Sequence, residues 1–163
     1  MIKMYNCHFG DCFCIEGKTD LVVDFGTWEP KKNKRESLLN PIIRDLREQS
    51  DFLLTHYHYD HYCGAVLMSA WYPNKKFRDI YIPDIWNALN SVEIVSLHLI
   101  ADIMASRLNS KMSLLDFVQS IACRTGKLVF IKRGDTIQNR FIALWPASSR
   151  CGQYLPARPL RTV

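Results

Sequence analysis

The sequence lacks the features that mark membrane, secreted and low-complexity proteins. Charged residues recur throughout its 163 positions, so no stretch approaches the roughly 20 uninterrupted apolar residues that a membrane-spanning helix needs. Residues 1–10 contain neither the apolar segment nor the small-residue cleavage site of a secretory signal peptide. With 48% hydrophobic residues, the chain is able to bury the core of one globular domain. We therefore predict a cytoplasmic protein with no membrane partner.

Paired cysteine spacing is also absent. None of the six cysteines forms a CxxC pair, and Cys12 and Cys14 flank Phe13 so that both lie on one face if the segment is a strand. This pattern favours reduced thiols in or near the core over a metal or redox role.

Acidic residues are missing after Asp135. The formal net charge is +5, but four arginines follow residue 139, so residues 1–139 are nearly neutral. A nucleic-acid partner therefore has only weak support from charge. Because prolines accumulate in the same stretch, we predict a domain over residues 1–147 and an irregular, basic tail over residues 148–163.

The first quarter of the chain has the composition of β structure. Short runs rich in Val, Ile, Phe, Tyr and Cys are separated by glycines, and they predict strands over residues 2–8, 11–16 and 21–25. The turn at 17–20 predicts that the second and third strands pair antiparallel.

A loop and a helix are expected next. The basic run 31–35 is predicted to be a solvated loop rather than a binding patch. Asn40 followed by Pro41 is typical of a helix start, and the apolar spacing after it predicts a helix up to Gln49.

The remainder of the chain has alternating strand and helix patterns. The apolar run in residues 51–55 predicts a buried strand. Further on, the patterns predict helices over residues 64–70 and 84–122 and strands over residues 79–83, 127–131 and 140–145.

Three of the five histidines lie within six residues, directly after the predicted buried strand. If this segment is extended, alternate side chains point the same way, so His56 and His58 are able to reach one ion while Asp60 and His61 face a neighbouring position. Imidazole and carboxylate ligands suit Zn²⁺, with Fe or Mn as substitutes. The pattern therefore predicts a metal site at the end of this strand.

The segment Thr55-His56-Tyr57-His58-Tyr59-Asp60-His61 resembles the His-x-His-x-Asp-His motif that defines the metallo-β-lactamase superfamily. Upstream, the runs 10–15 and 21–26 are similar to the family's opening hairpin, whose second strand ends in Asp and Gly. Downstream, residues 134–137 and the run 141–146 resemble the hairpin before the family's third metal motif.

The resemblance implies an α/β fold, the αββα sandwich, with a metal-activated water at the strand ends. It implies that His56 and His58 bind a first Zn²⁺ ion and that Asp60 and His61 bind a second, with Asp60 also oriented towards the attacking water. Asp24 matches the family residue that holds a ligand's other ring nitrogen or a loop backbone, and an Asp that caps a turn is the alternative interpretation of this position.

The sequence departs from the family pattern after Trp145. The family has a third metal-binding histidine there, whereas no histidine follows His98 in this chain. His98 lies in an apolar helical pattern and Cys151 in the unpatterned tail, so both are poor substitutes. The expectation is that only the first half to two-thirds of the sandwich is present.

Two functions are consistent with these observations. The first is a metal-dependent hydrolase of small-molecule or nucleotide substrates, with a phosphodiester or another ester-type bond as the target. The alternative is a catalytically incomplete metal-binding or interaction protein, whose exposed sheet surface drives association with a partner or into a homo-oligomer.

Overall fold

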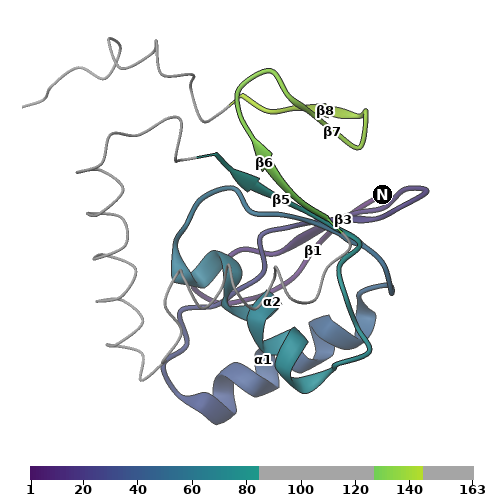
Figure 1. Cartoon of the computed structure of the whole chain (residues 1–163). Helices are drawn as coiled ribbons and strands as arrows, with labels where there is room; N and C mark the ends of the chain where they lie inside the picture. The colour runs from purple at the N-terminus through teal and green to yellow at the C-terminus, as the bar shows by residue number, and fades with distance from the viewer. Residues whose placement is uncertain (85–126, 145–163) are drawn as a thin grey trace, which may run out of the picture.

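The computed structural model describes residues 1–84 and 127–144 (Figure 1). A six-stranded sheet has the order β1-β2-β3-β4-β5-β6. Its strands are β1 (Ile2–Met4), β2 (Phe13–Ile15), β3 (Leu21–Val23), β4 (Asp51–Leu53), β5 (Asp79–Pro83) and β6 (Lys127–Ile131). The first three strands pair antiparallel, and β3 to β6 pair parallel. The predicted α/β class and the β2–β3 hairpin are confirmed.

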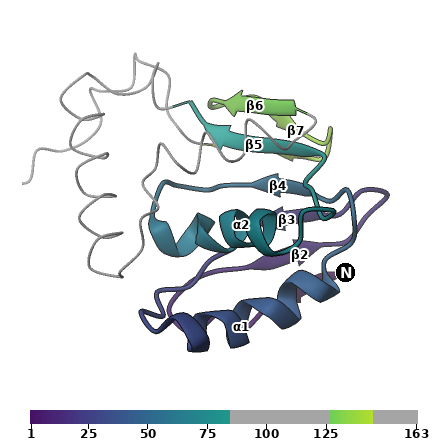
Figure 2. The same ribbon diagram turned by 60° about the horizontal axis from the view of Figure 1, so that its bottom comes forward.

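Each face of this sheet carries a different layer. Helices α1 (Lys32–Asp45) and α2 (Tyr59–Trp71) lie on one side, and a hairpin of β7 (Thr136–Ile137) and β8 (Phe141–Ile142) lies on the other (Figures 1 and 2). The described residues therefore form a helical layer, one sheet and a two-stranded piece of a second sheet. This arrangement is consistent with part of an αββα sandwich.

Strand alternation separates two apolar clusters. On the helical side, Val22, Phe52 and Ile80 pack in the larger cluster, together with residues of both helices. On the other side, Leu21 and Tyr81 join buried residues of the hairpin region in a smaller cluster. Since successive side chains of a strand point to opposite faces, one short strand contributes to both clusters.

Helix α1 corrects two predictions. It begins at Lys32 rather than near Pro41, so the run 31–35 is largely helical and Arg35 is buried. The reason is that Arg35, Leu39 and Ile43 lie four residues apart and form one buried face. Pro41 is exposed within the helix, where water is able to satisfy the carbonyl that a proline leaves unbonded.

Lys75 stabilises the carboxyl end of α1. The Lys75 ammonium donates hydrogen bonds to the carbonyl oxygens of Ile43, Arg44 and Leu46 at the carboxyl end of α1. Cations stabilise this end of a helix because its last carbonyl groups are unpaired.

The prediction of core thiols is confirmed for the four cysteines in the described part of the chain. Cys7, Cys12, Cys14 and Cys63 are free and buried. None of the helices in the described part of the chain has the length and apolarity that crossing a membrane requires.

Several predictions lie outside the described residues. They concern the helix over 84–122 beyond Asp84, the end of the strand over 140–145, the tail over 148–163, and the substitutes His98 and Cys151. Within the described part of the strand, pairing is limited to β8.

Candidate metal centre

The segment that follows β4 alternates between core and surface. The side chains of Tyr57 and Tyr59 are buried, and the Tyr57 hydroxyl donates to the carbonyl oxygen of Pro83 at 2.7 Å. His56 and His58, the residues that precede them, are half-buried and exposed, respectively. The tyrosines therefore anchor the segment and turn both imidazoles away from the core.

Helix α2 begins inside the histidine motif. Its first residue is Tyr59 and His58 is the capping residue, so the predicted helix start at Gly64 is wrong. The predicted extended geometry holds only as far as His58, because Asp60 and His61 lie in the first turn of the helix. Asp60 there is favourable, since the positive end of the helix dipole attracts a carboxylate.

Glycines allow two loops to approach this first turn. A Cβ atom on Gly26 would collide with the backbone of Asp60, and one on Gly10 would collide with the backbone of Gly26. The Phe25 amide donates to the carbonyl oxygen of His61 at 2.7 Å. The loop after β3 is thereby fastened to the start of α2.

Three imidazoles meet at this point. Nε2 of His56 lies 3.1 Å from Nδ1 of His58, and one ring nitrogen from each of His56, His58 and His61 lies within 4.8 Å of the others. Two imidazole nitrogens bound to one tetrahedral zinc ion at about 2.0 to 2.1 Å are about 3.3 to 3.4 Å apart. The pair His56 and His58 therefore fits the ligand spacing of a single ion with little movement.

The grouping of the predicted ligands differs from the expected two pairs, because His61 joins His56 and His58. His61, predicted to face a neighbouring position with Asp60, has its ring centroid 3.9 Å from that of His56. Asp60 is outside this group of three, but its Oδ2 lies 3.7 Å from Nε2 of His61. The carboxylate and the third imidazole are thus adjacent.

Asp24 lies beneath the cluster and is buried. Its Oδ2 is 2.9 Å from Nδ1 of His61 and accepts a 2.6 Å hydrogen bond from the Thr55 hydroxyl, while its Oδ1 accepts the Thr55 amide at 2.8 Å. Asp24 has a φ of 51°, an uncommon backbone conformation that Asp tolerates better than most residues. The carboxylate therefore contacts the ring nitrogen of His61 and the backbone of Thr55, the residue before His56.

This network sets the tautomers of two histidines. Because the Thr55 hydroxyl gives its proton to Asp24, its oxygen accepts one from Nδ1 of His56, which is 2.9 Å away. The lone pair of His56 is then on Nε2, the atom that faces His58. In the same way, Nδ1–H of His61 donates to Asp24 and leaves its Nε2 lone pair towards Asp60.

The histidine pKa values follow from burial and these partners. Burial lowers the pKa of His56, and the neighbouring His61 and His58 lower it further, so its lone pair stays available. Burial also acts to lower the pKa of His61, but the hydrogen bond and charge of Asp24, together with Asp60 and Asp11, outweigh it and raise the pKa. A metal ion bound through Nε2 of His61 would therefore face stronger competition from protons than one bound to His56.

Two contributors were missed in the sequence. The Thr55 hydroxyl links the Asp24 carboxylate to His56 through two hydrogen bonds. The Oδ2 atom of Asp11 lies 3.9 Å from Nδ1 of His61. A hydroxyl residue between a buried strand and the first histidine was the available signal for Thr55. Asp11 is brought in by a loop, which no periodicity reveals.

The profile of the metallo-beta-lactamase superfamily matches residues 5–91, just over half of the 163-residue chain. The match includes Asp24 and the whole histidine motif. The chain therefore belongs to the metallo-beta-lactamase superfamily. Comparisons with curated proteins and with solved structures gave no match.

Proposed function

We propose that the protein is a metal-dependent hydrolase that uses a metal-activated water to cleave a phosphodiester, a nucleotide or another ester-type bond. The observation that carries this proposal is the convergence of three imidazoles beside Asp60 at a strand end, in a chain of this superfamily. Such a site needs no protein nucleophile.

The proposed ligands are His56, His58, Asp60 and His61, for one or two Zn²⁺ ions, with Fe or Mn as substitutes. A bound ion of this kind lowers the pKa of a coordinated water towards neutrality and polarises the oxygen of the bond to be cleaved. The chain's own contribution is orientation. Asp24 and Thr55 hold two imidazoles with their lone pairs outward, and Asp60 is positioned to accept a proton next to His61.

Phosphodiester or nucleotide substrates are the preferred proposal, followed by thioesters and lactones. The final His61 of the motif is shared by superfamily members with phosphodiester, thioester and lactone substrates, so it favours this group of substrates over β-lactams. Two of the basic residues at 75–78 have structural roles instead, because Lys75 donates to the carboxyl end of α1 and Arg78 pairs with Asp51. From the sequence, we also propose that the protein is located in the cytoplasm.

Metal content tests the ligand set. Replacing His58 with Ala removes one of two closely spaced imidazole nitrogens, so we expect zinc retained after dialysis to fall below one tenth of the wild-type content. His8→Asn is the matched control, because His8 is exposed, lies outside the cluster, and has a φ of 57° that Asn tolerates. Unchanged zinc in H58A, measured by elemental analysis, would defeat the assignment.

Turnover tests the hydrolytic proposal. With a panel of phosphodiester, nucleotide, thioester and lactone substrates, we expect hydrolysis that a chelator abolishes and added Zn²⁺ restores. Asp60→Ala should reduce kcat by at least 10²-fold. Its cost in the free energy of unfolding should stay at about 0.3 to 1 kcal/mol, the contribution of a partly exposed carboxylate at the start of a helix. Activity that survives both treatments would exclude the metal mechanism.

A second candidate is a metal-binding interaction protein without turnover. A cavity of about 320 Å³ lies between the sheet and the β7–β8 region, and its lining is mainly apolar. Ile142 and Leu144 border it and are 66% and 79% exposed. An apolar surface of this kind favours association with a second copy or a partner. Concentration-dependent sedimentation of a protein that binds zinc but hydrolyses none of the panel would favour this candidate.

A further inference from the structure

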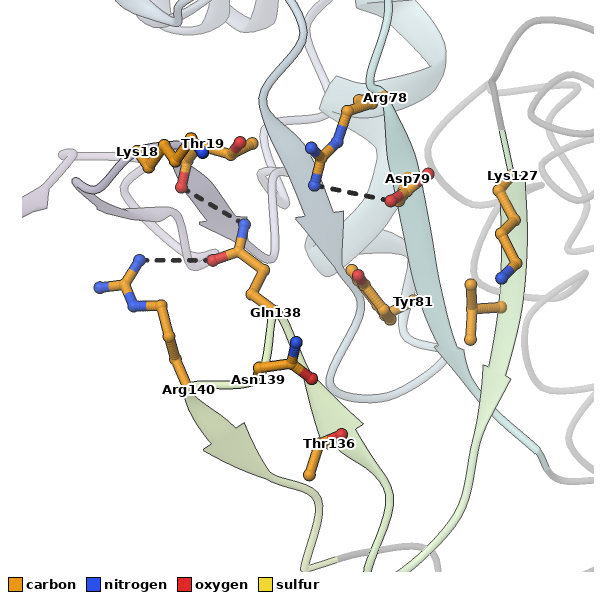
Figure 3. A pocket seen from close by; sticks show the side chains of 11 residues that line it. Lys18, Thr19, Arg78, Asp79, Tyr81, Lys127, Thr136, Gln138, Asn139 and Arg140 are labelled. Atoms are coloured by element: carbon orange, nitrogen blue, oxygen red, sulfur yellow. Dashed lines mark hydrogen bonds and ion pairs between the residues drawn. The ribbon is translucent and has the colours of Figure 1, made fainter.

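A second cavity, of about 460 Å³, lies at the opposite end of the sheet from the histidines. It is bordered by the β2–β3 turn, the starts of β5 and β6, and the tip of the β7–β8 hairpin (Figure 3). The four steps of β5 alone separate its start at Asp79 from its end at Pro83 by about 13 Å. The cavity is therefore too remote to hold the bond that the histidine cluster is proposed to cleave.

Positive charge dominates the lining. Lys18, Lys127, Arg78 and Arg140 border the cavity, against the single carboxylate of Asp79. Arg78 is already compensated, because it makes two hydrogen bonds of 2.9 and 2.8 Å with the buried Asp51. Four cations against the two carboxylates of Asp79 and Asp51 leave an excess of two positive charges.

The remaining three cations have no acidic partner in the part of the chain that the structure describes. Arg140 donates to two neutral oxygens, the carbonyl of Glu16 and the side chain of Gln138, each at 3.4 Å. Its guanidinium lies 5.1 Å from the ring centroid of Phe141 and against Gly17, where a Cβ atom would collide with it. Arg140 is thus held in place by neutral groups, which leaves its charge available to a ligand.

Neutral hydrogen-bonding groups complete the lining. Gln138 holds the hairpin tip to the sheet by donating to Asp51 at 2.7 Å, and Figure 3 shows it between Thr19 and Arg140. Gln138 and Asn139 have φ values of 54° and 53°. They are the two central residues of the tight turn between β7 and β8, which the Arg140 amide closes by donating to the Ile137 carbonyl oxygen at 3.0 Å.

We propose that this cavity binds a small phosphorylated molecule through Lys18, Lys127 and Arg140. A phosphate group carries about −1.5 to −2 charges near neutral pH, which matches the excess of two positive charges better than a single carboxylate does. Arg140 offers a planar fork of donors for two phosphate oxygens, and the lysines supply mobile ammonium groups. The cavity volume is in the range of small-molecule sites, about 300 to 1,000 Å³.

The test uses the full chain stripped of metal by a chelator, so that the histidine cluster does not hold the probe. Inorganic phosphate is titrated at constant ionic strength, with chloride as the reference anion, and backbone amide shifts are followed by NMR. We expect saturable shifts at Lys18, Lys127 and Arg140, the three residues proposed to bind it. Shifts confined to the histidine segment, or none that saturate, would overturn the proposal.

Matched variants separate a site from general electrostatics. The pair Lys18→Gln and Lys127→Gln should weaken phosphate binding at least tenfold. The control pair Lys76→Gln and Lys132→Gln removes the same charge from exposed lysines that do not border the cavity, and it should bind like the wild type. Equal weakening in both pairs would overturn the proposal. Because the protein carries no metal here, the result is independent of whether it is a hydrolase.

Discussion

At the scale of single residues, Asp24 joins two sides of the candidate metal centre. One of its oxygens is hydrogen-bonded both to His61 and to the Thr55 hydroxyl, which in turn accepts from His56. Its effect on a metal therefore passes through the orientation and tautomer of two proposed ligands.

Replacing Asp24 with Asn tests this positioning role. Asn keeps one acceptor oxygen, whereas Asp24 accepts three donors with two, so the NH2 group of Asn must face either the Thr55 amide or both His61 and the Thr55 hydroxyl. We therefore expect zinc affinity to fall about 10- to 100-fold, the usual cost of losing such a partner. The φ of 51° is tolerated by Asn as well, which limits backbone disturbance. Competition with a fluorescent chelator measures the affinity.

Asp20→Asn is the control for that experiment. Asp20 is also buried, but it pairs with Arg47 and the Gly17 amide, away from the histidines. It should lower stability without changing zinc affinity. If D24N binds zinc like the wild type, or if both variants lose affinity equally, Asp24 does not position the ligands.

Sequence was most informative about residues whose chemistry is local. The spacing of His56, His58 and His61 predicted a histidine cluster, and the three side chains do converge. Thr55 and Asp11 were not predicted as contributors, because their roles depend on contacts with segments that are distant in the chain. A single hydroxyl or carboxylate has no periodic signal.

At the scale of elements, the start of α2 is the part of the site most sensitive to packing. The loops containing Gly10 and Gly26 contact the first turn so closely that neither position has room for a Cβ atom. The distance between the β3 end, which carries Asp24, and the α2 start, which carries His61, depends on this contact.

Gly26→Ala should therefore disturb both folding and the metal centre. The added methyl group meets the backbone of Asp60, which moves only with the helix, so we expect a loss of about 1 to 3 kcal/mol in the free energy of unfolding and weaker zinc binding. Urea denaturation and chelator competition measure the two effects.

Gly17→Ala provides the comparison for G26A. A methyl group there meets chiefly the flexible end of the Arg140 side chain, so the loss of stability should be smaller and zinc binding unchanged. Equal zinc affinity in G26A and the wild type would show that the close approach of these loops does not set the geometry.

The boundaries of helices were harder to predict than their presence. Pro41 was interpreted as a helix start because its missing N–H is harmless in a first turn, yet it lies on an exposed face inside α1. The helix instead follows the four-residue spacing of its buried residues from Arg35 to Ile43. Arg35 is one of them, although the run of basic residues had predicted a loop there. Tertiary burial thus outweighed local preference.

At the scale of the whole molecule, Asp51 connects segments that are far apart in sequence. This carboxylate is fully buried at the start of β4 and contacts Arg78, the Asp79 amide and Gln138 of the hairpin tip. Long-range contacts of this kind have no signature in sequence, where Asp51 was only the first residue of a predicted strand.

Asp51→Asn should destabilise the whole domain. Asn keeps the shape but loses the charge that makes both Arg78 hydrogen bonds strong, and its NH2 group is left facing donors, because both oxygens of Asp51 accept hydrogen bonds. Hydrogen bonds to charged groups contribute about 1.5 to 3 kcal/mol each. Since Arg78 is half exposed and regains water, we expect a total loss of about 2 to 3 kcal/mol in the free energy of unfolding, measured by urea denaturation.

Asp79→Asn is the matched control. Asp79 lies next to the same arginine, but its Oδ2 is 3.6 Å from Nη2, beyond hydrogen-bond distance, and its side chain is partly exposed. Its loss should stay below about 0.5 kcal/mol, as is usual for a solvent-exposed pair. Hydrogen exchange adds a spatial readout: D51N should speed exchange at amides of the β7–β8 hairpin, whose tip is held by Gln138. If D51N and D79N have equal stability, or if the hairpin amides exchange at the wild-type rate in D51N, the second-sheet hairpin is held by its apolar contacts alone.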